Sequence, residues 1–283
     1  QLQSVIVPTA TIQNVLNCID KAGLDVAGLV IKPLSAALGV LSPEDELAGA
    51  VAVDIGGGTT SVSVFSDGRP KYLGVIPVGG DHITNDVGSV LKLPLNKSEE
   101  IKKEISVFDA PENAEETLDF VYNARDYSVS RQDLHEIIRC RMEELLDTFV
   151  RANIKAAGVP MLPAGIVFTG GVSKTNGIDA FALDVLDLPA RVSVPLDADR
   201  MPPGRNTQEY SSAAGIIRYI LEKERDPFRY LDNPSIVKPS VEQTVRTGIV
   251  PDTLIKIKKT KDGGGGTSFD PIGKLGEFFK ELL

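Results

Sequence analysis

A turn of three consecutive glycines between two apolar segments constrains the fold of this chain more than any other feature. Residues 51–53 form an apolar run that leads into Asp54, the glycines follow at 56–58, and residues 61–65 form a second strand-like run. Successive glycines expose several backbone N–H groups on one concave side because no Cβ covers them, and that arrangement suits phosphate oxygens. An aspartate at a strand end can hold a hydrated Mg²⁺ that bridges such oxygens. Asp54 is therefore a candidate magnesium ligand through water, and the candidate phosphate-binding residues are Gly56, Gly57, Gly58, Thr59 and Thr60.

The glycine-rich turn differs from the two commonest nucleotide-binding loops. No Lys followed by Ser or Thr comes after the glycines, as in a P-loop, and no helix follows at once, as in a Rossmann unit. The alternative interpretation is a glycine-rich hairpin with an incidental aspartate. The turn by itself leaves both interpretations open.

Helical and strand-like periodicities alternate along the chain, which predicts an α/β fold with a three-stranded meander between residues 49 and 78. The expected helices are 9–22, a short one after Pro33, 79–91, 98–104, 131–157, 178–186 and 208–224. The expected strands are 4–7, 26–31, 50–53, 61–65, 71–76, 165–169 and 191–194, with a hairpin around 109–113 and a short extended piece at 253–257.

The composition excludes several classes of protein. Lys and Arg number 30 against 39 Asp and Glu, and the formal net charge of −9 argues against a broad nucleic-acid-binding surface. No run of about 18 apolar residues occurs, so the sequence predicts no membrane-spanning helix.

Cys18 and Cys140 lie in apolar-periodic stretches, and we expect both to be buried free thiols. We expect structural or surface roles for His82 and His135, with His135 facing out of its helix, because neither has a second ligand at metal-ligand spacing.

Two motifs in order point to a known superfamily. Asp-Ile-Gly-Gly-Gly-Thr-Thr at 54–60 resembles the second phosphate loop of the actin, Hsp70 and sugar-kinase superfamily. Residues 165–173 are similar to the strand and Gly-Gly turn that contact adenosine in that superfamily. Within it, the sequence resembles the FtsA family of bacterial cell division. The resemblance covers about residues 4–224, and the segments that carry it are 32–37, 75–86, 98–102 and 189–192.

The resemblance implies a fold and a subdomain organisation. The fold is an actin-like, ribonuclease-H-like α/β domain with a smaller α+β subdomain inserted. The implied ranges are 1–47 for the returning part of subdomain IA, 48–93 and 146–225 for the two parts of subdomain IIA, and 94–145 for subdomain IIB. The superfamily's first phosphate loop, most of subdomain IA and all of subdomain IC would precede residue 1, so we expect the C-terminal half of a longer protein.

The resemblance also implies ATP and Mg²⁺ as cofactors. Asp54 would act through Mg²⁺, and the glycines and threonines after it would wrap the β- and γ-phosphates. Glu99 and Lys102 would approach the ribose and base, although the alternative is an ordinary solvated pair on a helix surface. The residues that would border the adenosine are Gly170, Gly171 and Ser173. Ser61 occupies a position where relatives usually carry a second Asp, so we expect at most a weak ATPase.

The last residues of the chain read as an amphipathic helix. Residues 226–268 form a linker rich in Pro, Lys and Gly, and Asp270-Pro271 is a good helix start for the segment 269–283. This helix is too short to cross a bilayer and would lie in the plane of the lipid headgroups. The alternative is a helix that docks back onto its own domain. The residues of the apolar stripe that would enter the lipid are Ile272, Leu275, Phe278, Phe279 and Leu282.

The resemblance implies a function in cell division. The protein would polymerise into actin-like filaments and tether FtsZ filaments to the inner face of the bacterial cytoplasmic membrane, as a peripheral protein. The contact with FtsZ would lie around residues 94–145, and other division proteins are further possible partners. Two alternatives remain open at this stage: a pilus-assembly scaffold of the PilM type, and a superfamily sugar or acid kinase.

Overall fold

The computed structural model describes residues 9–26, 29–111, 113, 115–226 and 256–257. The chain divides into two compact units, one made of residues 1–31 with 221–283 and the other of residues 32–220. The predicted strand 4–7 and the predicted terminal helix 269–283 lie outside the described residues. Within the part that is described, none of the helices has both the length and the apolar composition that crossing a bilayer requires.

Among its described residues, the first unit has a helix near the start of the chain and a short strand pair. Helix α1 (Thr9–Lys21) forms as predicted, and the chain leaves it through Gly23 at a φ of 73°. Strand β1 (Leu24–Asp25) then pairs antiparallel with β9 (Lys256–Ile257). The predicted strand 26–31 is wrong for the described part of that range, because the ladder with β9 ends at Asp25. Of the predicted extended piece 253–257, the last two residues are described and form β9.

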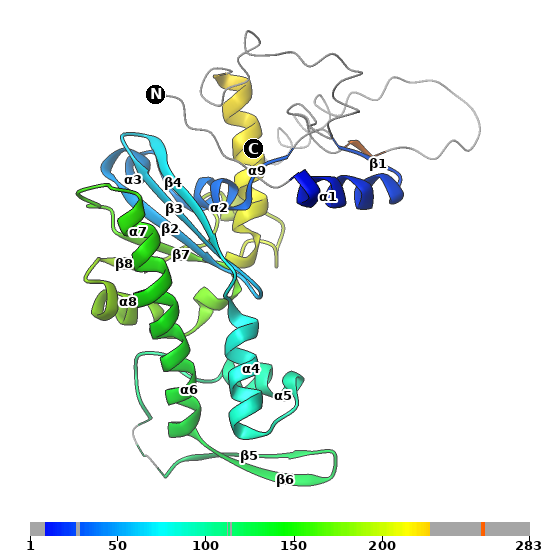
Figure 1. Ribbon diagram of the computed structural model, residues 1–283, viewed down its shortest axis with the longest axis vertical. Coiled ribbons are helices and arrows are strands. Elements are labelled where there is room, and N and C mark those ends of the chain that lie inside the picture. The colour runs from blue at the N-terminus through cyan, green and yellow to red at the C-terminus, as the bar shows by residue number, and fades with distance from the viewer. Residues whose placement is uncertain (1–8, 27–28, 112, 114, 227–255, 258–283) are drawn as a thin grey trace. The chain divides into compact units, whose positions relative to one another are not determined.

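The second unit is built on a five-stranded sheet with the order β4-β3-β2-β7-β8 (Figure 1). The predicted meander is confirmed, because β2, β3 and β4 follow one another as antiparallel neighbours, while β7 and β8 extend the sheet in parallel. The strands are β2 (Ala50–Ile55), β3 (Thr60–Ser66), β4 (Arg69–Ile76), β7 (Ile166–Thr169) and β8 (Ala190–Val192).

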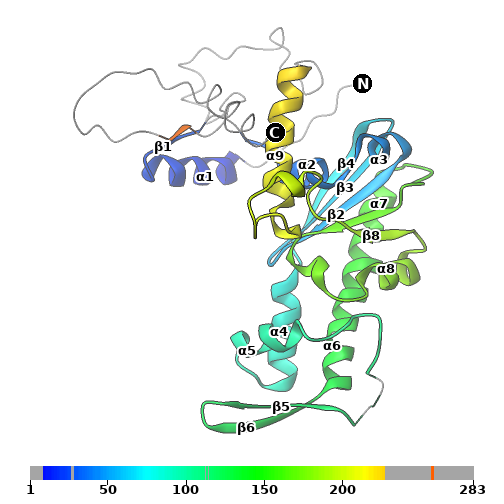
Figure 2. The same cartoon turned by 180° about the vertical axis from the view of Figure 1, so that it is seen from behind.

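Helices cover both faces of this sheet (Figures 1 and 2). Strand β2 shows why, since Val51, Val53 and Ile55 belong to one apolar core, whereas Ala50 and Ala52 belong to a second one. Successive side chains of a strand point to opposite faces, so a strand that is apolar throughout is buried on both. The first core is closed by a long helical rod of three continuous segments, α6 (Arg131–Glu143), a π-helical segment (Glu144–Val150) and α7 (Arg151–Ala156).

Helix α2 (Lys32–Val40) closes the second core and touches α9 (Ser211–Arg225) through two glycines. A Cβ on Gly39 would lie 2.1 Å from the carbonyl oxygen of Ser211, and one on Gly215 would lie 1.7 Å from that of Ser35. Both distances are far below van der Waals contact, so only glycine permits this approach of the two backbones.

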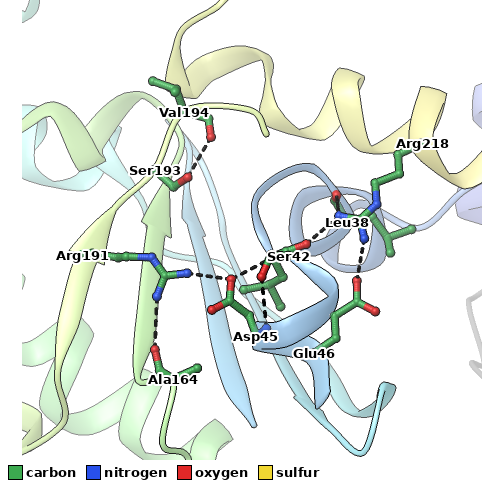
Figure 3. Close-up of polar contacts among 10 residues, drawn as sticks. Leu38, Ser42, Asp45, Glu46, Ala164, Arg191, Ser193, Val194 and Arg218 are labelled. Carbon is green, nitrogen blue, oxygen red and sulfur yellow. Dashed lines mark hydrogen bonds and ion pairs between the residues drawn. The ribbon is translucent and has the colours of Figure 1, made fainter. Parts of the chain in front are cut away.

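Helix α3 (Pro43–Ala48) follows α2 and is fixed by an arginine of α9 (Figure 3). Arg218 donates to the carbonyl oxygens of Leu38 and Leu41 at 2.9 and 2.5 Å. Its other nitrogen lies 3.2 Å from Oε1 of Glu46, whose side chain is 1% exposed. A buried carboxylate needs such a partner, so Arg218 fixes α3 to α9.

Away from the sheet, the second unit continues into α4 (Gly80–Leu91), α5 (Leu95–Lys102) and a hairpin of β5 (Thr117–Tyr122) with β6 (Arg125–Ser130) (Figures 1 and 2). The helix predicted from residue 79 is confirmed, and α5 begins three residues before the predicted residue 98. The hairpin predicted around 109–113 is wrong in position. Its turn lies at Asn123 and Ala124, whose positive φ angles of 48° and 58° suit a two-residue hairpin loop.

The remaining helices of the second unit are close to their predicted ranges. Helix α8 (Ile178–Leu186) is confirmed residue for residue, and α9 is preceded by a short 3₁₀ turn at Gln208–Tyr210, so the predicted helix 208–224 is present in two parts.

Three side chains are not where the sequence led us to expect them. Cys18 and Cys140 are exposed, and His135 is buried at 3% exposure with its Nδ1 atom 3.0 Å from the carbonyl oxygen of Ser106. In α6 the buried stripe comprises residues 134, 135, 138 and 142. At 100° per residue, position 135 falls inside that stripe and position 140 falls opposite it.

Candidate functional site

The glycine turn, residues 56–59, joins β2 to β3 and is held from behind by the first residues of α4. The N–H of Gly80 donates to the carbonyl oxygen of Gly56, and the N–H of Asp81 donates to that of Gly57, both at 2.9 Å. A Cβ on Gly79 would lie 2.4 Å from the oxygen of Gly57, so a glycine is required there. The helix therefore fixes the carbonyl side of the turn.

The opposite side of the glycine turn presents amide groups. Among the described residues, no hydrogen bond uses the backbone N–H of Gly57, Gly58 or Thr59. A Cβ on Gly58 would meet no atom within 4 Å, so the space beside the turn is open. Consecutive free N–H groups with fixed carbonyls behind them form a concavity that suits an anion. The predicted role of these residues is compatible with this geometry.

Thr60 has a different environment from the rest of the predicted phosphate loop. It is fully buried, and its hydroxyl donates to the carbonyl oxygen of Val78 at 2.8 Å. This hydrogen bond ties β3 to the segment before α4. The side chain of Thr60 is thus a structural element of the turn, and residues 56–59 form its open surface.

Asp54 is placed at the end of β2, directly beside the glycine turn, and is 5% exposed. Its Oδ2 atom lies 3.0 Å from Nζ of Lys32 and accepts a hydrogen bond from the hydroxyl of Ser212 at 3.2 Å. Lys32 is the first residue of α2, and its Nζ atom would lie 3.2 Å from a Cβ on Gly56. One ammonium group thus contacts the carboxylate and lies against the glycine turn.

These surroundings do not fit a divalent cation. Mg²⁺ requires oxygen ligands, and negative neighbours must balance its positive charge. The group next to Asp54, however, is already a cation. Within the described ranges no three His, Cys, Asp or Glu side chains cluster as a metal site. Ser61, which pairs with Asp54 across the β2–β3 ladder, contributes a buried hydroxyl without a hydrogen-bond partner in the described structure. The magnesium prediction stays a prediction that the donor set does not favour.

A second glycine turn lies against Asp54. It follows β7, and a Cβ on Gly170, whose φ is 86°, would lie 2.3 Å from Oδ1 of Asp54. The hydroxyl of Ser173, which is 2% exposed, donates to the carbonyl oxygen of Gly170 at 2.7 Å. A Cβ on Gly80 would lie 2.7 Å from Cγ2 of Val172. The structure therefore brings together the two loops that the sequence identified separately.

Glu99 and Lys102 form an ion pair on α5 that reaches the start of α4. Nζ of Lys102 bonds to Glu99, to the hydroxyl of Thr84 at 2.8 Å and to the carbonyl oxygen of Gly80 at 3.2 Å. Burial alone raises the pKa of Glu99, but hydrogen bonds from Lys102, Thr84 and Lys103 outweigh it and lower the pKa from 4.5 to about 2. With the side chain of Lys102 only 12% exposed, the pair is more than a solvated surface contact.

A comparison with protein families shows to which family the chain belongs. The model of the family described as "Cell division protein FtsA" matches residues 51–215, a range that contains both glycine turns. The chain belongs to the FtsA family. Curated FtsA proteins agree with this assignment. The chain is 34% identical to that of Pseudomonas aeruginosa over 218 residues, covering 76% of this chain and 52% of the relative.

Two further FtsA relatives match the same share of this chain. The protein of Neisseria meningitidis is 34% identical over 76% of this chain and 53% of its own length, and that of Bacillus subtilis is 29% identical over 76% and 48%. The chain spans about half the length of the curated relatives it matches.

Solved structures confirm the predicted actin-like fold. MreB5 of Spiroplasma citri bound to ADP has a TM-score of 0.59 at 19% identity, covering 78% of this chain and 68% of that one. The same protein bound to AMPPNP has a TM-score of 0.60 at 21% identity with the same coverage. The PilM-PilN complex of type IV pilus biogenesis reaches 0.53 at 20% identity, covering 71% and 55%. At these identities the likeness concerns the fold alone.

Sequence reasoning on this FtsA-family chain missed four polar side chains near the turns, namely Lys32, Asp81, Thr84 and Ser212. The carboxylate of Asp81 lies close to the glycine turn, since a Cβ on Gly57 would be 3.1 Å from its Oδ1 atom. Thr84 could have been noticed because it follows Gly80 by one helical turn, and its hydroxyl bonds to that carbonyl oxygen at 3.0 Å. Lys32 and Ser212 carry no local signal, because only the packing of α2 and α9 brings them to Asp54.

Proposed function

We propose that this FtsA-family chain binds ATP, with the phosphates at the glycine turn. The observation that supports this most is the arrangement of the turn. The carbonyl oxygens of Gly56 and Gly57 accept hydrogen bonds from the first residues of α4, whereas the N–H groups of residues 57–59 have no partner in the described structure. Oxygens of a polyphosphate match such donors in charge and number. MreB5, which has the same fold, is bound to ADP in one structure and to AMPPNP in another.

The adenosine would lie between the second turn and α5. Gly170 and Gly171 leave that turn without side chains, and Ser173 holds its backbone through the bond to Gly170. Glu99 and Lys102 approach the same place from α5, because Lys102 reaches the carbonyl oxygen of Gly80 and Gly80 is beside Val172. We assign the ribose and base contacts to these side chains.

A charge change at an open position tests ATP binding without disturbing the fold. Gly58→Glu adds a side chain where a Cβ meets nothing within 4 Å, and it brings a negative charge to the proposed phosphate site. We expect ATP affinity, measured by calorimetry, to fall about tenfold or more. Gly58→Gln has the same size without the charge, so it accounts for any steric loss and should bind ATP more tightly than Gly58→Glu. Equal affinities of the Glu and Gln variants would refute the phosphate assignment.

The cell-division role follows from the family, and its details are proposals. We propose that the protein forms filaments and tethers FtsZ to the cytoplasmic side of the bacterial inner membrane, with residues 94–145 as subdomain IIB and as the FtsZ contact. Co-sedimentation of FtsZ filaments with the chain tests that contact. The family match over residues 51–215 favours this role over a PilM-type scaffold or a sugar or acid kinase.

The membrane contact is assigned to residues 269–283, which the structure does not describe. Five large apolar side chains and the upstream lysines of residues 256–261 would bind an anionic lipid surface. Co-sedimentation with anionic liposomes should fall sharply when the chain is truncated after Asp262. Equal binding of the two forms would remove the membrane assignment.

A further inference from the structure

The ammonium group of Lys32 contacts both a carboxylate and the glycine turn. It lies 3.0 Å from Oδ2 of Asp54 and against Gly56, so it contacts the carboxylate at the strand end and the glycine turn at once. The side chain of Lys32 is 42% exposed, whereas that of Asp54 is 7% exposed. The carboxylate is therefore enclosed, and the cation is the part of the pair that a ligand can reach.

Among the described residues, Lys32 is the cation that contacts the glycine turn. Asp81 contributes a negative charge close to Gly57. Lys102 is bonded to Glu99, which neutralises it, and it faces Gly80. Without Lys32, an approaching polyphosphate would meet two carboxylates, Asp54 and Asp81, beside the free amides. The negative charges of Asp54 and Asp81 oppose the binding of an anion beside them.

We propose that Lys32 supplies the positive charge that Mg²⁺ would otherwise supply at this site, so that the chain binds the polyphosphate of a nucleotide without requiring a divalent cation. This inference rests on the proposed ATP site. Lys32 neutralises Asp54 and donates to a phosphate oxygen held at the glycine turn. A lysine provides a permanent charge and three donors at one point, which suits a phosphate oxygen. The buried hydroxyl of Ser61 on the paired strand, with no partner in the described structure, adds no charge that would attract a metal ion.

Calorimetric titration of ATP into the 283-residue chain, once with excess magnesium and once with EDTA, tests this. The original chain should bind ATP with affinities within about threefold of each other in the two buffers, whereas Lys32→Gln should lose about tenfold in EDTA and regain most of it with magnesium. Lys32→Arg keeps a positive charge but not the single-point geometry of the ammonium group, so its loss of affinity in EDTA should be smaller than that of Lys32→Gln. Asp81→Asn removes the opposing charge and should raise the affinity in both buffers.

Lys71→Gln provides the matched control. Lys71 pairs with Asp67 at 2.9 Å at the other end of β3, so this variant breaks a Lys–Asp pair on the same sheet far from the glycine turn. Its ATP affinity should not change in either buffer. If the original chain binds ATP only with magnesium and Lys32→Gln binds equally well, the inference is overturned while the ATP site stands. If no variant binds ATP in either buffer, both are overturned.

Discussion

Gly170 lies so close to Asp54 that a Cβ on the glycine would be 2.3 Å from the Oδ1 atom of the carboxylate. Gly170 also has a φ of 86°, which L-residues rarely adopt. We expect Gly170→Ala to lower the free energy of unfolding by about 2 kcal/mol or more, because clash and backbone strain add. Gly171→Ala is the matched change, since its Cβ would be 3.7 Å from the nearest atom, and it should cost less than about 0.5 kcal/mol. Urea unfolding that gave both variants the same stability would contradict this packing.

Ser61 and Ser63 offer a test of hydrogen bonding inside β3. Both are about 1% exposed, but Ser63 donates to the carbonyl oxygen of Pro33 at 2.7 Å, whereas the hydroxyl of Ser61 has no partner in the described structure. Ser63→Ala should therefore destabilise the chain by about 1–3 kcal/mol, and Ser61→Ala should be neutral or stabilising. Thermal unfolding of the two variants measures the difference. A larger loss for Ser61→Ala would mean that its hydroxyl does have a partner.

The lowered pKa of Glu99 predicts a dependence of stability on pH. Because its pKa is about 2 in the folded chain against 4.5 ordinarily, ionised Glu99 stabilises the fold fully above pH 4.5. This contribution is lost as the pH falls from about 4.5 to about 2. The stability difference between the original chain and Glu99→Gln should shrink over that range. Glu100→Gln is the control, since Glu100 is 62% exposed in its pair with Lys97. A difference that does not change with pH would contradict the ion pair with Lys102.

Two arginines that hold the same helix should differ in importance (Figure 3). Arg218 pairs with the buried Glu46, so Arg218→Met should lower the free energy of unfolding by about 3 kcal/mol or more. Arg191 lies 2.7 Å from Asp45 and donates to the carbonyl oxygen of Ala164, but its side chain is 44% exposed. Arg191→Met should therefore cost less than about 1 kcal/mol. Chemical unfolding that ranks the two variants in the opposite order would refute the importance given to burial.

The fold was predictable where the local signal is strong. Glycines at 56–58 between two strand-like runs predict the meander, and the apolar repeat of residues 131–157 predicts the long helical rod. Boundaries and orientations were less predictable. The sequence around 109–113 has good turn residues, yet the hairpin closes at Asn123. The pairing of β5 with β6 determines the position of that turn. His135 was expected to face out, but it is buried. The periodicity of the helix did not by itself show which face of α6 packs against the rest of the unit.

The candidate site was half predictable. The two glycine turns were recognisable as motifs, because each consists of neighbouring residues. The ion pair of Lys32 with Asp54 joins residues 22 positions apart and depends on how α2 packs over the sheet. Thr84 became part of the Glu99 network only because α4 and α5 lie together. Contacts of this kind arise from tertiary packing, to which no local pattern points.

Amide chemical shifts report whether the backbone N–H groups of the glycine turn bind the phosphates of ATP. On addition of ATP to ¹⁵N-labelled chain, we predict large shifts for the N–H signals of Gly57, Gly58 and Thr59. The signal of Gly68, in the turn at the other end of β3, should not move. If ATP leaves the three amides of the glycine turn unchanged, or shifts Gly68 as much as them, the glycine turn does not bind the phosphates of ATP.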